Sequence, residues 1–166
     1  MDSSRYLFMI TGAPGAGKST LAKRIKDGAR GLIEPIADVC EADDFWYIVG
    51  NGKYAFDRSR LKYAHEWCQL KARRLMEAGL NLIVSNTNIR PLDRKPYFDM
   101  AKEYGYRVVF IHLENDFGSI HGVPPEIVEG MRRNYVGMTP EEALLVVEPD
   151  EMSEELSEVL ERSLRG

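Results

Sequence analysis

Short apolar runs alternate along the chain with longer stretches in which apolar residues recur at helical spacing. The clearest runs cover residues 6–11, 80–84 and 106–113, and a weaker one covers 35–41. Runs of this length are typical of strands that are buried on both faces of a parallel sheet. Helix formers fill the segments between them, and these helices are expected to end at glycines. The expected helices run from about 21 to Gly28, from about 57 to 78 before Gly79, and from about 91 to Gly105. The pattern predicts an α/β fold, a parallel sheet with helices on both faces and its ligand at the carboxyl ends of the strands.

The last third of the chain carries further element signals. A helix is expected to begin at 122–125, and Thr139-Pro140-Glu141-Glu142 has the form of a capping box with proline at the first helical position. The apolar run 144–147 is expected to add a last strand. Beyond it, an apolar stripe lies along an acidic segment that we predict to be helical. The stripe consists of Met152, Leu156, Val159 and Leu160. We therefore divide the chain into a domain over 1–147 and an acidic helical tail over 148–166, which docks on the domain or acts in dimerisation.

Composition narrows the classes of protein to consider. The chain has 166 residues, of which 44% are hydrophobic, and carries a net charge of −4. Residues 148–166 alone carry −5, so the remaining body is near neutral and a polyanionic partner is not excluded. No apolar stretch approaches the roughly 20 residues that span a bilayer, and the N-terminus lacks a signal-peptide pattern. We expect a cytoplasmic protein with no membrane partner, in which Cys40 and Cys68 are reduced, buried thiols.

One motif between the first strand and the first helix carries clear chemistry. Residues 12–20 match the pattern of the phosphate-binding loop, G-x-x-x-x-G-K-[ST], at every fixed position. Glycines in such a loop allow successive amides to point at phosphate oxygens, and the start of the helix adds positive potential. Lys18 is expected to bridge the β- and γ-phosphates, and Ser19 to bind Mg²⁺. The motif predicts binding of ATP with Mg²⁺ by Gly12, Ala13, Pro14, Gly15, Ala16, Gly17, Lys18, Ser19 and Thr20.

Other residues distinguish among phosphate-loop proteins. Hydrolytic motors usually end an apolar strand in Asp-Glu, where an acid orients water, but the most apolar strand here ends in Ser85-Asn86. This favours transfer to a bound acceptor. Asp43 and Asp44 follow the second strand and should lie at the same rim as the phosphate loop. One carboxylate is then suited to accept a hydroxyl proton while its neighbour, Asp44, helps to hold Mg²⁺. The alternative interpretation of this pair is a helix N-cap with a solvated charge.

These motifs, in this order, resemble the kinase domain of the phage and animal polynucleotide kinases and related small P-loop ATPases of phages and bacteria. The resemblance covers roughly residues 5–137 and identifies the fold as P-loop kinase-like. Besides the loop, it depends on Ala42-Asp43-Asp44-Phe45, Ser85-Asn86-Thr87-Asn88, Pro96-Tyr97 through Tyr104-Gly105-Tyr106, and Val123-Pro124-Pro125-Glu126-Ile127 with Met131-Arg132.

The resemblance implies that Asp43 is the general base and that Asn86 and Asn88 face the acceptor or the nucleotide. Arg90 and Arg94, just beyond them, are candidates for binding phosphates or are solvated helix residues. Trp46 stands where the phage enzyme has an arginine near its acceptor, and an indole favours stacking on a base.

The chain departs from the family in the lid that precedes Val123. The phage enzymes have arginines there, whereas residues 115–121 contain no Arg or Lys. We expect Arg132 or Arg133 to replace them as the catalytic cation, because such a charge can contribute about 10³-fold or more to the rate. His121 is a candidate phosphate contact or an ordinary turn residue.

The sequence therefore predicts an ATP-dependent kinase whose acceptor is the 5′-hydroxyl of a polynucleotide. Three alternatives remain open at this point. The acceptor is a small molecule or a hydroxymethylated base in DNA, the chain is an ATP-binding regulatory module, or it is a simple ATPase.

Overall fold

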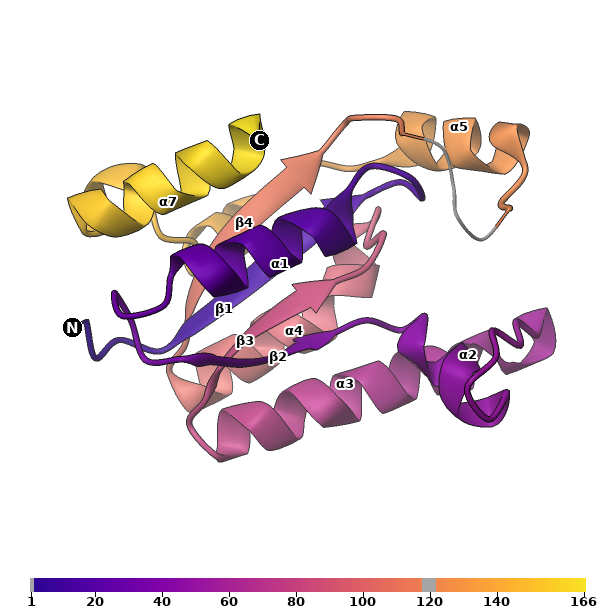
Figure 1. The fold of residues 1–166 in the computed structure, drawn as a ribbon, viewed down its shortest axis with the longest axis horizontal. Helices are drawn as coiled ribbons and strands as arrows, with labels where there is room; N and C mark the ends of the chain where they lie inside the picture. The colour runs from indigo at the N-terminus through magenta and orange to yellow at the C-terminus, as the bar shows by residue number, and fades with distance from the viewer. Residues whose placement is uncertain (1, 118–121) are drawn as a thin grey trace.

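The computed structural model describes residues 2–117 and 122–166. Its centre is a four-stranded parallel sheet in the order β2-β3-β1-β4 (Figure 1). The strands are β1 (Tyr6–Gly12), β2 (Ile36–Cys40), β3 (Asn81–Ser85) and β4 (Arg107–Leu113). Since all four run in the same direction, the segments that follow them leave at one edge of the sheet. The predicted parallel α/β sheet is confirmed.

Helices cover both faces of the sheet (Figure 1). The α-helices are α1 (Lys18–Gly28), α2 (Asp44–Val49), α3 (Leu61–Glu77), α4 (Pro91–Tyr104), α5 (Pro125–Asn134), α6 (Pro140–Ala143) and α7 (Glu154–Arg165), and two 3₁₀ turns are η1 (Arg58–Arg60) and η2 (Pro149–Glu151). One hydrophobic core lies between the sheet and α1 with α7, and a second lies between the sheet and α3 with α4.

The alternation of side chains along β1 explains these two cores. Phe8 and Ile10 point into the core under α1, whereas Leu7 and Met9 point into the core under α3 and α4. Every residue of β1 is buried, as expected for a central parallel strand. The strand therefore holds the start of the phosphate loop in a fixed position.

The structure corrects two details of the expected elements. The helix predicted over 57–78 begins as the 3₁₀ turn η1 and continues as α3, in which Leu61 is exposed. Residues 144–147 form no full strand: only Val146 bridges Val108 of β4, and the Val147 amide donates to the Val108 carbonyl at 2.8 Å. The expected capping box at the start of α6 is present.

Helix α7 packs on α1 (Figure 1), and Leu156 and Leu160 of the apolar stripe are buried in the core between the sheet and α1. A Cβ atom added to Gly28 at the end of α1 would lie 2.7 Å from Cγ1 of Val159, so the two helices make close contact there. The lid candidate His121 lies outside the described residues. Within 2–117 and 122–166, no helix combines the length and apolar character that crossing a membrane requires.

Candidate functional site

The phosphate loop connects β1 to α1 at the carboxyl edge of the sheet. Gly17 has φ of 91°, in the left-handed region that glycine adopts readily, and it directly precedes α1. A Cβ atom on Gly12 would lie 2.9 Å from the Leu113 carbonyl oxygen of β4, so only glycine fits that close approach. Phosphate oxygens bind well where loop amides and a helix N-terminus converge. The glycine conformations therefore agree with a phosphate loop, and phosphate binding by its amides stays a prediction.

Lys18 folds back onto this loop. Its Nζ donates to the carbonyl oxygens of Gly12 and Ala13, at 2.9 and 3.0 Å. Burial lowers the pKa of Lys18 to about 8, although Asp43 and Glu41 act in the opposite direction. A buried ammonium that has few protein partners is suited to an incoming polyanion. The structure thus brings Lys18, Asp43 and Glu41 into electrostatic contact.

Glu41 is a site residue that the sequence reasoning missed. Ser19, the expected metal-binding hydroxyl, donates to Oε1 of Glu41 at 2.8 Å. Burial raises the pKa of Glu41, Asp44 and Asp43 raise it further, and the hydrogen bond from Ser19 opposes this rise. The carboxylate that is hydrogen-bonded to Ser19 is therefore that of Glu41. The available signal was its position directly after Cys40, the last residue of β2.

The side-chain oxygens of Ser19 and Glu41 fit a Mg²⁺ ion whose other ligands are substrate phosphates and water. Among the described residues, no three His, Cys, Asp or Glu side chains form a metal cluster. Mg²⁺ in nucleotide enzymes keeps several waters and takes only one or two protein ligands besides phosphates. Ser19 and Glu41 provide such a pair of oxygens. A metal role for Asp44 stays a prediction, and its carboxyl interacts electrostatically with Lys71 and Asp38.

Asp43 precedes α2 and lies at the same rim. Asp43 occupies the N-cap position of α2, as the alternative interpretation has it, but its side chain makes no capping hydrogen bond to the helix. Instead the Tyr54 hydroxyl donates to Oδ1 of Asp43 at 3.4 Å. Asp43 is exposed and interacts electrostatically with Lys18. The role of Asp43 as proton acceptor stays a prediction.

The two asparagines after β3 are buried, which corrects the expectation that they contact substrate. Oδ1 of Asn86 accepts from the Ala42 amide at 2.8 Å, and its Nδ2 donates to Sγ of Cys68. Asn86 thereby ties the turn that carries Asp43 to β3. Asn88 is 4% exposed with φ of 42°, and its Nδ2 has no hydrogen-bond partner among the described residues. The Asn86 side chain therefore supports the rim from beneath.

Trp46 and Arg94 are also structural, and their expected substrate contacts are wrong. Trp46 is 1% exposed and packs edge-on against Phe45 and Phe56, so its indole has no free face for a base. Arg94 is fully buried and paired with Glu142. Arg90 is exposed, caps α4 and pairs with Asp93 at 2.9 Å, so its phosphate role stays a prediction.

Of the two candidate lid cations, the structure brings only Arg132 beside the phosphate loop. Arg132 donates to the Asn115 carbonyl at 2.9 Å and pairs with Asp116 at 3.5 Å, whereas Arg133 is exposed on α5. Arg132 also helps to line a cavity of about 240 Å³ next to the loop. The other lining residues are Ala13, Ile89, His112, Leu113, Glu114, Met131 and Tyr135.

The segment after β4 crosses the phosphate loop. The Phe117 amide donates to the Gly15 carbonyl at 2.8 Å, and the Phe117 ring lies 3.2 Å from where a Cβ on Gly17 would be. The sequence reasoning searched this segment only for arginine and lysine and so passed over Phe117. An exposed aromatic ring therefore covers the start of α1.

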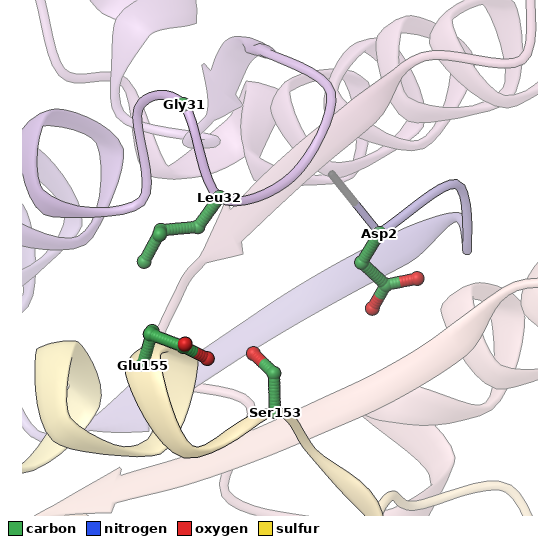
Figure 2. A pocket seen from close by; sticks show the side chains of 5 residues that line it. All are labelled: Asp2, Gly31, Leu32, Ser153 and Glu155. Atoms are coloured by element: carbon green, nitrogen blue, oxygen red, sulfur yellow. The ribbon is translucent and has the colours of Figure 1, made fainter.

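A second cavity, of about 250 Å³, lies at the other end of the molecule, near the chain's N-terminus (Figure 2). Its lining includes the carboxylates of Asp2 and Glu155 with Ser153, and no basic side chain. This chemistry does not suit a phosphate ligand. The candidate site is therefore at the carboxyl edge of the sheet.

Comparison with known proteins agrees with this geometry. A family model described as an AAA domain matches residues 7–117, which contain β1 to β4 and the phosphate loop. The chain belongs to the AAA domain family. Human NEDD4-binding protein 2 is 32% identical to this AAA domain over 139 residues, and the match covers 78% of the chain and 8% of the human protein. The AAA domain thus corresponds to a small part of that relative.

Two solved structures share the fold of this AAA domain. A candidate kinase from Chloroflexus aurantiacus has a TM-score of 0.62 and 16% identity, with 98% of each chain covered. A chain of the Pnkp1/Rnl/Hen1 RNA repair complex has a TM-score of 0.52 and 16% identity, with 99% of this AAA domain and 47% of that chain covered. These likenesses establish a P-loop kinase-like fold.

Proposed function

We propose that this AAA domain is an ATP-dependent phosphotransferase that moves the γ-phosphoryl group of ATP to the 5′-hydroxyl of a polynucleotide. One observation carries the proposal: Asp43 lies at the same rim as Lys18 and the Ser19–Glu41 pair, with no capping bond to α2. A transfer enzyme needs a proton acceptor and a phosphate clamp at one place.

Each residue has one task in this reaction. The loop amides and Lys18 bind the β- and γ-phosphates, and Ser19 with Glu41 binds Mg²⁺, which neutralises phosphate charge. The acceptor hydroxyl oxygen attacks the γ-phosphorus while its proton passes to Asp43. The bond from the γ-phosphorus to the bridging oxygen breaks, and ADP leaves with that electron pair. Arg132, beside Ala13, is suited to stabilise the transferring charge.

A polynucleotide acceptor is supported by two independent features. Neighbours of the same fold include a chain of an RNA repair complex. Residues 148–166 carry a net charge of −5 and the whole chain carries −4, so residues 1–147 together are near neutral. The site face is therefore compatible with a polyanionic acceptor.

The test uses γ-labelled ATP and a panel of acceptors. The panel contains 5′-hydroxyl oligonucleotides, free nucleosides and DNA with hydroxymethylated bases. We expect label on the oligonucleotides, and Asp43→Asn should reduce transfer by about 10² to 10⁴-fold while ATP still binds. Asp99→Asn is the matched control, because it makes the same change to an exposed carboxylate on α4.

Other outcomes select other functions. Label on nucleosides or modified bases alone would identify a different acceptor class. Phosphate release without any acceptor would identify a simple ATPase, and tight ATP binding with neither reaction would favour a regulatory module. Full transfer by Asp43→Asn would remove Asp43 from its role as general base.

A further inference from the structure

The connection between α2 and α3 forms an exposed surface beside Asp43. The connection folds back on α2: the Gly52 amide donates to the Tyr47 carbonyl at 2.7 Å, and the Ala55 amide donates to the Trp46 carbonyl at 3.2 Å. Aromatic and basic residues alternate in sequence along α2 and this connection. We call them the α2–α3 surface, which consists of Tyr47, Lys53, Tyr54, Phe56 and Arg58.

Aromatic rings on this surface are held in place and still reach solvent. Phe56 is 55% exposed, yet its ring packs edge-on against buried Trp46, with centroids 5.2 Å apart. Tyr47 is 41% exposed, and its ring lies 5.3 Å from that of Tyr54. Rigid exposed rings of this kind are suitable platforms for stacking bases. Trp46 is buried, so we assign the stacking role that was expected of it to the exposed rings of Tyr47 and Phe56.

The same segment is strongly basic in an acidic protein. Residues 51–62 contain four basic residues and one acidic residue, whereas the whole chain carries −4. Lys53 and Arg58 flank the aromatic residues Tyr54 and Phe56 in sequence. Interleaved positive charges and aromatic rings match a chain of alternating phosphates and bases. This excess of positive charge favours a polyanionic partner over an apolar protein surface.

The surface is continuous with the proposed general base. The Tyr54 hydroxyl donates to Asp43 at 3.4 Å, and Asp43 directly precedes α2. A strand lying on the surface would therefore end close to Asp43. We infer that the α2–α3 surface binds a single-stranded segment of nucleic acid adjacent to the acceptor hydroxyl. The inference deepens the proposed function and rests on it for the direction of the strand.

The experiment measures binding of a 3′-fluorescein-labelled single-stranded 12-mer with a free 5′-hydroxyl, by fluorescence anisotropy without ATP. The surface variant is Lys53→Gln/Phe56→Leu/Arg58→Gln, in which leucine keeps apolar contact with Trp46. The matched control, Leu92→Ala/Lys95→Gln/Lys102→Gln, removes two charges and trims one exposed apolar side chain on α4. Circular dichroism checks that both variants are folded.

We expect the surface variant to bind at least about tenfold more weakly, since losing one stacking ring alone weakens binding by roughly fivefold or more. Its slope of log K against log salt concentration should fall by about 1.4, the value for two lost phosphate contacts to a single strand. The control should match the wild type within about twofold. Equal binding by all three proteins, or equal loss in both variants, would overturn the inference, and so would the absence of binding by the wild type.

Transfer assays separate this inference from the proposed function. If the wild type binds through the surface but phosphorylates no acceptor, the proposed function fails and the surface stands. If the wild type phosphorylates the oligonucleotide and the surface variant keeps the same KM, the function stands and the surface is refuted. The expected result is a raised KM for the 12-mer with unchanged kcat, and unchanged activity on a free nucleoside.

Discussion

Replacing Arg94 tests whether this side chain is structural, as its contacts indicate, or binds substrate, as its position in the sequence suggests. The guanidinium is fully buried and donates to both carboxylate oxygens of Glu142, at 2.8 and 2.9 Å. It also donates to the carbonyls of Asn88, Val136 and Gly137. Arg94→Ala leaves a buried carboxylate and three carbonyls without this donor.

The expected loss of stability is large. Removing one partner of a buried ion pair typically costs about 3–5 kcal/mol, because the other charge stays buried without compensation. For a domain of this size, 1 kcal/mol corresponds to roughly 2–4 °C in Tm. Arg94→Ala should therefore lower Tm by roughly 6–20 °C. Arg94→Met/Glu142→Leu should recover much of that loss, since it leaves no unpaired charge.

The pH dependence of the free energy of unfolding provides a second test of the Arg94–Glu142 ion pair. Burial raises the pKa of Glu142, but the hydrogen bonds from Arg94 and from the Thr139 amide outweigh this and hold the pKa below its usual value. A depressed carboxyl pKa stabilises the fold above the unfolded pKa, and this contribution disappears as pH falls through the folded value. The stability difference between wild type and Arg94→Ala should thus shrink in acid. Urea unfolding followed by circular dichroism at pH 7 and pH 3 measures it. A variant that unfolds within about 1 kcal/mol of the wild type at pH 7 and loses acceptor phosphorylation would refute the structural role.

Two further predictions concern the phosphate loop and the contact between α1 and α7. Because burial lowers the pKa of Lys18 to about 8, the affinity for ATP should fall above that pH by about tenfold per pH unit. Lys18→Arg should remove the pH dependence, and a flat wild-type titration of Kd from pH 7 to 9.5 would contradict the assignment. Gly28→Ala should destabilise the protein by about 1–3 kcal/mol, because the new Cβ would lie 2.7 Å from Val159. Val159→Ala in the same chain should restore the urea midpoint toward that of Val159→Ala alone, and an unchanged midpoint for Gly28→Ala would show that α7 does not press on α1.

The elements and the phosphate loop could be predicted because their signals are local. Strand β1 is a continuous apolar run, α4 begins at a proline and ends before a glycine, and the loop has fixed spacing. Each signal involves residues within a few positions of one another. The apolar run 144–147 was mispredicted as a strand for the same reason, because local hydrophobicity does not reveal that the run forms only a single isolated bridge, between Val146 and Val108 of β4.

The site residues were harder to predict because their partners are distant in sequence. Arg94 is separated from Glu142 by 48 positions, and Asn86 from Ala42 by 44. A polar residue just after a strand gives the same local sequence pattern whether its side chain contacts substrate or a buried backbone amide. Glu41 was not predicted because the adjacent pair Asp43 and Asp44 is the more prominent carboxylate pattern after β2. Tertiary packing therefore decides which of the polar residues at the rim remain available for chemistry.

Because the side-chain amide of Asn86 is buried beneath the rim, the two sides of the rim have different roles. The Asn86 side chain bonds the Ala42 amide and so fixes the turn immediately before Asp43, while its own backbone amide donates to the Ile10 carbonyl of β1 at 3.3 Å. A carboxylate held by such a turn pays little reorganisation free energy when a hydroxyl arrives. The end of β3 therefore positions the proposed base from beneath and is closed to the acceptor. Acceptor recognition then has to come from the exposed side of Asp43, where Tyr54 contacts it and the α2–α3 surface begins.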